Sequence, residues 1–370
     1  MERRAFLLAL ASLPALRVGS VNANAYADAA PDADEAAFAA VRTGVKLVFP
    51  LDHGAHPDFR TEWWYATGWL SLPDGSPLGF QITFFRVRTG IAQRNPSAFA
   101  PRQLILAHAA IADPRLGRLH HDQRVARVGF GRAGFDTART GIWVGDWRLD
   151  QFNEHFKAEV RGGDFSYSLT FIPHGPPLLH GVGGFSVKAP DPRHASYYYS
   201  CPQLEVKGTV TLGGRQQAVT GRAWLDHEWS SELLPKEAQG WDWLGVNLDD
   251  GGALMAFRLR TKKQTPLWTA ATFRSAAGEV QVLLPEAIAF DPVRRWRSTR
   301  TGIAYPVEWR VRLGSRIFQL TPLIDDQELD SRRTTGAVYW EGAVRVTESG
   351  HEIGRGYLEM TGYGERIQIG

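Results

Sequence analysis

The strongest constraint on the fold is a two-residue alternation of apolar and polar side chains that recurs from Phe49 onward. Apolar residues alternate with polar residues or glycine in LEVKGTVTL (204–212) and ALMAFRLR (253–260). Successive side chains of a strand point to opposite faces, so this pattern is typical of β-strands. Beyond residue 45 no helical period competes. We therefore predict an all-β protein with roughly sixteen antiparallel strands in two barrels or sandwiches.

Two internal echoes indicate a duplication. The segment GRAWLD (221–226), which follows Gly208, is matched by GRGYLE (354–359), which follows Gly342. A weaker echo relates WYATG (64–68) to WDWLG (241–245), and the segment SSELLPKEAQ (230–239) interrupts the alternation between the two copies. The predicted domains are therefore residues 46–232 and residues 233–370.

Composition excludes several classes of function. The 42 basic and 39 acidic residues are nearly balanced and dispersed, which argues against a nucleic-acid partner. No apolar run is long enough for a transmembrane helix. The single cysteine, Cys201, rules out an intramolecular disulfide. The 13 tryptophans point to an aromatic-lined cavity or a heavy core.

The N-terminus is predicted to be an export signal over residues 1–27, followed by a linker over residues 28–45. Arg3 and Arg4 precede an apolar run, and Ala25-Tyr26-Ala27 has the form of a cleavage site. The Arg-Arg pair resembles a twin-arginine signal. We therefore expect a periplasmic or secreted protein; an N-terminal amphipathic helix is the alternative.

The richest candidate site is Asp226-His227-Glu228-Trp229, followed by Trp241-Asp242-Trp243. On a strand, Asp226 and Glu228 face one way while His227 and Trp229 face the other. A carboxyl group held among indole rings is desolvated, which raises its pKa and suits it to donate a proton. The alternative is that Asp226 and Glu228 pair with Arg222 or another arginine at the domain junction.

A second cluster runs from Asp52-His53-Gly54-Ala55-His56 to Glu62-Trp63-Trp64-Tyr65. His53 and His56, with Glu62 or Asp58, have the donor types of a metal site but no recognised zinc spacing. We expect no metal ion and no other cofactor. A barrel strand has one inward face, so two aromatic side chains of this strand are predicted to face outward, onto the other domain, unless the strand is buried on both sides.

Residues 174–200 are predicted to form a long loop, in which Tyr198 is a candidate ligand-binding residue. His108 is expected to be a buried core group. No nucleophile elbow and no phosphate-binding glycine loop occurs, which argues against a serine hydrolase or a nucleotide enzyme.

Several long motifs resemble the carotenoid 1,2-hydratase/AttH-type lipocalin-like family. They are DHGAHPDFRTEWWYATGWL, GGFSVKAPDPRHASYYYS, GRAWLDHEWSSELL, GWDWLGVNLDDGGALMAFRLR and GRGYLEMTGY. The resemblance covers about residue 46 to the C-terminus and implies two tandem lipocalin-like β-barrel domains. It also implies an association of exported members with an ABC transporter permease.

Characterised enzymes of that wider family add water to a terminal double bond of acyclic carotenoids without a cofactor. Their His-x-Trp element is matched by His227 and Trp229, but their Tyr-x-Asp element has no match in Met255-Ala256-Phe257-Arg258-Leu259. If another acid replaces it, Asp226, Glu228 and Asp242 are the nearest. Glu62 and the tryptophans and tyrosines of both clusters (Trp63, Trp64, Tyr65, Trp229, Trp241 and Trp243) would bind the apolar ligand.

Three functions stay open. The first is a hydratase-like hydro-lyase that acts on an apolar isoprenoid or acyl molecule. The second is a non-catalytic lipid-binding accessory protein of an envelope transporter. The third is a secreted hydrolase, which has only a family label behind it.

Overall fold

The computed structural model describes residues 38–91, 93–232 and 234–366, which lie in one compact unit spanning residues 36–370. The predicted export signal (1–27) lies outside the described residues, as does most of the predicted linker. The described residues contain strands and two short 3₁₀ turns, η1 (Leu51–His53) and η2 (Pro285–Ala287), but no α-helix. The prediction of an all-β protein is confirmed.

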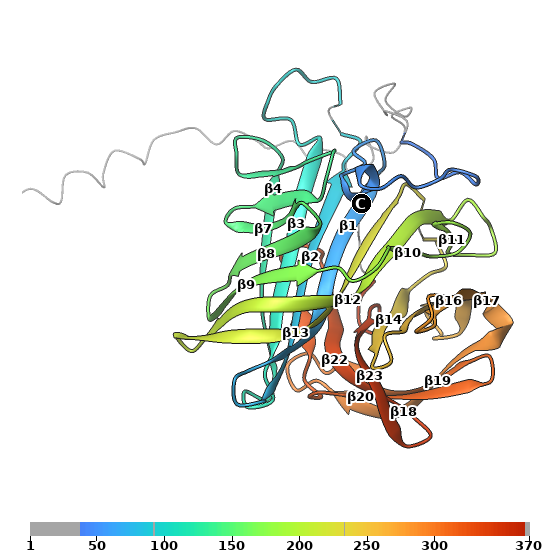
Figure 1. Ribbon diagram of the computed structural model, residues 1–370. Coiled ribbons are helices and arrows are strands. Elements are labelled where there is room, and N and C mark those ends of the chain that lie inside the picture. Colours follow the sequence, from blue (N-terminus) through green and yellow to red (C-terminus); the bar gives the residue numbers. More distant parts are fainter. Residues whose placement is uncertain (1–37, 92, 233, 367–370) are drawn as a thin grey trace, which may run out of the picture. The chain divides into compact units, whose positions relative to one another are not determined.

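The strands form two antiparallel sheets (Figure 1). The first sheet contains β1 (Thr61–Ser71), β2 (Pro77–Arg88), β3 (Gln103–Ala112), β4 (Leu119–Arg127), β5 (Ala133–Phe135), β6 (Gly141–Val144), β7 (Trp147–Phe152), β8 (His155–Arg161), β9 (Phe165–Ile172), β10 (Leu178–Leu179), β11 (Phe185–Val187), β12 (Ala195–Leu212) and β13 (Arg215–Ser230). The second contains β14 (Gly240–Leu248), β15 (Ala253–Arg260), β16 (Pro266–Arg274), β17 (Val280–Leu283), β18 (Ile288–Arg297), β19 (Ala304–Leu313), β20 (Arg316–Pro322), β21 (Glu328–Asp330), β22 (Val338–Glu348) and β23 (His351–Met360).

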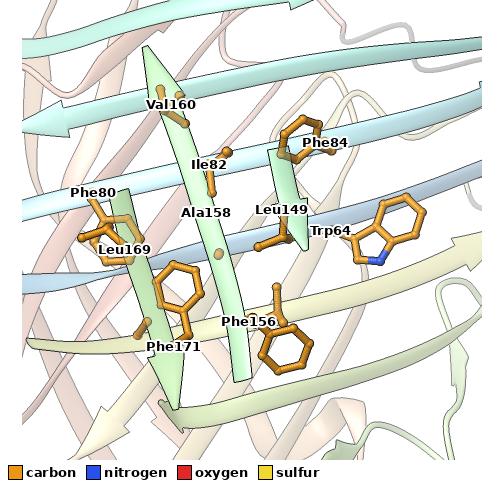
Figure 2. Packing of buried hydrophobic residues seen from close by; sticks show 14 of the residues in the cluster. Trp64, Phe80, Ile82, Phe84, Leu149, Phe156, Ala158, Val160, Leu169 and Phe171 are labelled. Carbon is orange, nitrogen blue, oxygen red and sulfur yellow. The ribbon is translucent and has the colours of Figure 1, made fainter. Parts of the chain in front are cut away.

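The first sheet curls into a nearly closed barrel. Its strand order is β4-β3-β2-β1-β13-β12-β9-β8-β7-β6-β5, and β3 contacts both β5 and β6 at the other end of the order. Inside it, Trp64 and Phe84 of β1 and β2 belong to the same apolar core as Leu149, Phe156 and Phe171 of β7–β9 (Figure 2). Burial of these large side chains is the main stabilising contribution to this half of the fold.

The second sheet repeats the central strand order of the first. The order β2-β1-β13-β12 corresponds to β15-β14-β23-β22. The glycines of the stronger echo share a physical role. A Cβ at Gly221 would meet the Trp69 carbonyl oxygen at 2.0 Å, and one at Gly354 would meet the Asn247 carbonyl oxygen at 2.5 Å. Neither position can carry a side chain without moving the neighbouring strand.

The weaker echo is correct in strand but wrong by one residue in register. Tyr65 pairs with Asp226 across β1 and β13, and Trp243 pairs with Glu359 across β14 and β23. Tyr65 therefore corresponds to Trp243, and its neighbour Trp63 corresponds to Trp241. Local sequence similarity could not fix this register, because cross-strand partners set it.

The two sheets meet through the outward face of the central strands of each. Tyr65, Trp69 and Trp224 of the first sheet share an apolar cluster with Trp243 and Phe257 of the second. Hydrogen bonds also join the sheets: Trp69 Nε1 donates to the Gly356 carbonyl at 2.9 Å, and Asn247 Nδ2 donates to the Ala223 carbonyl at 3.0 Å. The chain passes from one sheet to the other between Ser230 and Gly240. The division into two domains stays a prediction.

The prediction of a long loop over residues 174–200 is wrong in its last part. Residues from Ala195 onward belong to β12, whose pairing with β13 runs from Tyr197–Trp229 to Leu212–Arg215 with one register shift between Cys201 and Leu204. Three adjacent tyrosines suit a strand that has one face in the barrel and the other against the second sheet, so both faces bury aromatic rings.

Candidate functional site

A cavity of about 540 Å³ opens between the two sheets. Its lining includes Trp63 and Tyr65 of β1 and Trp241 and Trp243 of β14, the corresponding aromatic pairs of the two sheets. The prediction that two aromatics of this part of β1 face outward is confirmed, since Trp63 and Tyr65 line this cavity while Trp64 packs inside the barrel. An aromatic hollow of this size is typical of small-molecule sites.

Asp226 on β13 lies in the wall of this cavity and is almost completely buried. Its Oδ1 accepts hydrogen bonds from Ser200 Oγ at 2.5 Å and Trp224 Nε1 at 2.5 Å, and its Oδ2 accepts one from the Tyr198 hydroxyl at 2.8 Å. Burial raises the pKa of Asp226 to about 7, although the three donors act in the opposite direction. A carboxyl group with this pKa can both carry and release a proton near neutral pH.

Tyr198 connects Asp226 to the second sheet. Its hydroxyl accepts a hydrogen bond from Trp243 Nε1 at 2.9 Å and donates to Asp226. The position of the Asp226 carboxyl group therefore depends on contact between the two sheets. Tyr198, a predicted ligand-binding residue, also lines the cavity.

Glu228, two residues along β13, faces the same cavity but has a cationic partner. Its Oε1 lies 2.7 Å from Lys188 Nζ and accepts a hydrogen bond from Ser196 Oγ. The Lys188 ammonium also lies over the rings of Tyr198, at 4.6 Å, and Phe257, at 4.3 Å. Glu228 therefore has a cation in contact with it, whereas Asp226 has none among the described residues.

Glu359 adds a third acid to the cavity from β23, where it corresponds to Asp226 in the duplicated unit. Trp241 Nε1 donates to its Oε2 at 2.9 Å. Burial raises the pKa of Glu359 to about 7, with Asp226 and Glu228 adding to the rise. Its cross-strand neighbour Glu341 is also buried, and its pKa is raised well above the usual range.

Sequence reasoning missed Glu359 and Lys188 as site residues. The echo of GRAWLD by GRGYLE carried the signal for Glu359, because it equates this residue with Asp226. No comparable signal exists for Lys188, which reaches the cavity just after β11.

The alternating face of β13 places His227 and Trp229 inside the barrel, away from the cavity. There His227 Nε2 lies 2.9 Å from Glu62 Oε1 and His56 Nδ1 lies 2.8 Å from the same oxygen, while Arg86 Nε donates to Glu62 Oε2 at 2.7 Å. Trp229 stacks on His56 with ring centroids 3.7 Å apart. The predicted catalytic residues of β13 are thus divided between opposite faces of the first sheet: Asp226 and Glu228 line the cavity, and His227 lies inside the barrel.

His53, the other histidine of the turn cluster, also belongs to this barrel network. His53 Nδ1 lies 2.6 Å from the Tyr199 hydroxyl, which lies 3.0 Å from His227 Nδ1. Among the described residues, His56, Glu62 and His227 offer ligand atoms within 4.8 Å of one another. These atoms already bond one another, so the cluster is satisfied without a metal ion. His108 is likewise a satisfied buried group, with Tyr339 and Thr334 as partners.

Asp242 lies outside the cavity, although Trp241 and Trp243 on either side line it. Asp242 Oδ2 accepts from Arg258 Nη2 at 2.7 Å and from Arg260 Nε at 2.8 Å, and its carboxyl group is fully buried. Asp242 is therefore an arginine-paired buried group, whereas neither Asp226 nor Glu228, for which the sequence left arginine pairing as an alternative, pairs with an arginine among the described residues.

The chain belongs to the AttH-like family, whose model matches residues 40–363. A candidate AttH from Nitrosomonas europaea has the same fold, with a TM-score of 0.83 and 49% identity, covering 88% of this chain and 100% of that one. No curated protein matches the chain.

Two more distant structures share the fold alone. Kievitone hydratase from Nectria haematococca is 14% identical, with a TM-score of 0.66, and the match covers 88% of this chain and 96% of that one. CghA with Sch210972 is 15% identical, with a TM-score of 0.52, covering 83% of this chain and 89% of that one. In the described part of the chain, no helix has the length and apolar character needed to cross a membrane.

Proposed function

We propose that the protein is a hydratase-like enzyme that adds water to a carbon–carbon double bond of an apolar substrate held between its two sheets. The observation that carries this proposal is Asp226, a buried carboxyl group with a pKa of about 7 in an aromatic cavity. The hydratase among the structures of the same fold is consistent with the proposal.

The proposed reaction uses two carboxyl groups. Protonated Asp226 gives its proton to one carbon of the double bond, whose π electrons form the new C–H bond. The cation left on the other carbon is stabilised by the faces of Trp63, Trp241 and Trp243. Water attacks this carbon and passes a proton to ionised Glu359. The product is an alcohol, and one proton returns from Glu359 to Asp226 through solvent.

Acid and base roles require different protonation states at the same pH. Asp226 and Glu359 interact electrostatically and both have a pKa of about 7, so near neutral pH the pair holds about one proton between them. This is the arrangement in which one carboxyl group donates while the other accepts.

The test is incorporation of heavy oxygen. The protein is incubated with lipid extract from its own cell envelope in ¹⁸O-labelled water, and products that gain the mass of one labelled water are identified by mass spectrometry. Asp226→Asn is expected to abolish incorporation while leaving ligand binding intact. Asp146→Asn, an exposed carboxyl in the β6–β7 turn, is the matched control. Full incorporation by Asp226→Asn would refute the acid role.

The same cavity supports a second candidate, carriage of an apolar molecule without chemistry. Its apolar lining favours binding whether or not a reaction follows. Native mass spectrometry of the periplasmic protein that shows a bound lipid, with no ¹⁸O product, would favour carriage. Export through the N-terminal signal and an envelope transporter partner belong to this proposal as expectations.

A further inference from the structure

The cavity changes character between its buried and its exposed lining. Its buried lining is mostly apolar and aromatic and contains Asp226 and the ion pair of Glu228 with Lys188. Its exposed lining residues are Arg60, Glu232, Lys236 and Arg366, hereafter the rim. Three of these four rim side chains are cationic, so the rim is electropositive while the interior is apolar and acidic.

The three rim cations are not used by the protein to pair its own acids. The Arg60 guanidinium lies over the Phe38 ring, 5.3 Å from its centroid, and Arg366 Nη1 donates to the Lys236 carbonyl at 3.3 Å. Within the ranges that the structure describes, none of the three forms an ion pair. Lys188 in the buried lining, by contrast, is paired with Glu228. The rim acid, Glu232, interacts with Arg193.

We propose that the ligand of this cavity is an unsaturated chain ending in an anionic group, a carboxylate or a phosphate, which Arg60, Lys236 and Arg366 hold at the rim. The inference rests on the proposed function for the position of the double bond and adds the chemistry of the other end of the molecule. Burial of the chain supplies most of the affinity, and the cations select the head group.

Binding of three probes to the full chain tests this selection of the head group. Oleate, oleyl monophosphate and oleyl alcohol, which share one C18 unsaturated chain, each displace a fluorescent apolar reporter in separate titrations. At low salt we expect the better of the two anions to bind about tenfold more tightly than the alcohol, the effect of three exposed charge contacts. This preference should shrink at high salt. The tighter anion identifies carboxylate or phosphate as the head group.

The triple variant Arg60→Gln, Lys236→Gln, Arg366→Gln is expected to lose the preference while its affinity for oleyl alcohol stays unchanged. The matched control removes three exposed arginines elsewhere, Arg215, Arg310 and Arg312, and should keep the preference. Equal binding of anions and alcohol by the unaltered protein would overturn the inference and leave the proposed function standing. Failure of all three probes to bind would count against both.

Discussion

At Asp226, burial and hydrogen bonding act on one carboxyl group in opposite directions. Three donors reach its two oxygens, and each favours the ionised form, yet burial prevails and the pKa rises to about 7. Asp242, another acid of the same sequence cluster, is buried as well but has two arginines in contact. The presence or absence of a cation thus separates a chemically useful acid from a structural one.

The first prediction contrasts these two acids. Asp242→Asn leaves Arg258 and Arg260 buried without a counter-charge, so it should lower the free energy of unfolding by about 3 to 5 kcal/mol. Urea unfolding measures this loss, and ¹⁸O incorporation by the folded fraction should persist. At pH 5, where Asp226 is protonated and neutral, Asp226→Asn should show the reverse, with small loss of stability and no incorporation. Equal loss of activity in both variants would contradict this division.

The second prediction concerns pH. Folding raises the pKa of Asp226 from about 4 to about 7, so between these values the native state binds more protons than the unfolded state. The stabilisation from Asp226 is therefore complete below pH 4 and is lost as pH rises to 7. The amide of Asp226→Asn does not titrate. The free energy of unfolding of this variant, relative to that of the wild type, should therefore rise by about 3 kcal/mol between pH 5 and pH 8. If urea unfolding gives the same difference in stability between variant and wild type at pH 5 and pH 8, the pKa of Asp226 is not raised.

The same titration predicts the pH profile of the reaction. A general acid must be protonated, so the rate should fall as pH rises through about 7. Initial rates of ¹⁸O incorporation from pH 5 to pH 9 measure this limb. Because Asp226 and Glu359 interact, the profile reports the pair rather than one residue. A rate that increases steadily to pH 9 would exclude Asp226 as the acid.

At the scale of the element, β13 serves two sites because its side chains alternate. Asp226 and Glu228 face the second sheet, whereas His227 and Trp229 face the barrel interior. The sequence alone predicts this separation, since it follows from the two-residue period of any strand. The sequence does not tell which face of β13 lines the cavity, because that depends on what packs against each face.

The barrel network gives the third prediction. Glu62 accepts hydrogen bonds from His56, His227 and Arg86, and these partners hold the pKa of Glu62 far below its usual range despite full burial. Glu62→Gln removes the negative charge that pairs with buried Arg86, so it should cost about 3 kcal/mol or more in urea unfolding. The folded fraction of Glu62→Gln should keep its ¹⁸O incorporation. A loss of activity without loss of stability would instead place the network in the reaction.

At the scale of the whole molecule, the contact between the sheets is both core and site. Trp69, Trp224 and Trp243 join one apolar cluster across the sheets, and Tyr198 joins Trp243 to Asp226. A sheet separated from its partner would expose these rings to water. The cavity and the raised pKa of its acids exist only where both sheets are present.

The fourth prediction is that the two sheets unfold together. Since they share an aromatic interface, calorimetry should show one transition whose calorimetric and van't Hoff enthalpies agree. A fragment of residues 233–370 produced alone should be less stable and should bind apolar dyes, because the cluster side of β14 and β15 is uncovered. Two separate transitions would show that each sheet is an independent domain.

The sequence by itself determined the strands, the duplication and the separation of Asp226 from His227, because alternation and echoed glycines are local signals. It placed Tyr198 in a loop and left the roles of Asp226 and Asp242 open, since both are acids beside aromatic residues. Only the tertiary structure decided between them: Arg258 and Arg260 contact Asp242, while Asp226 is buried without a cation. Partners distant in the chain set burial and charge, and no short pattern in the sequence records them.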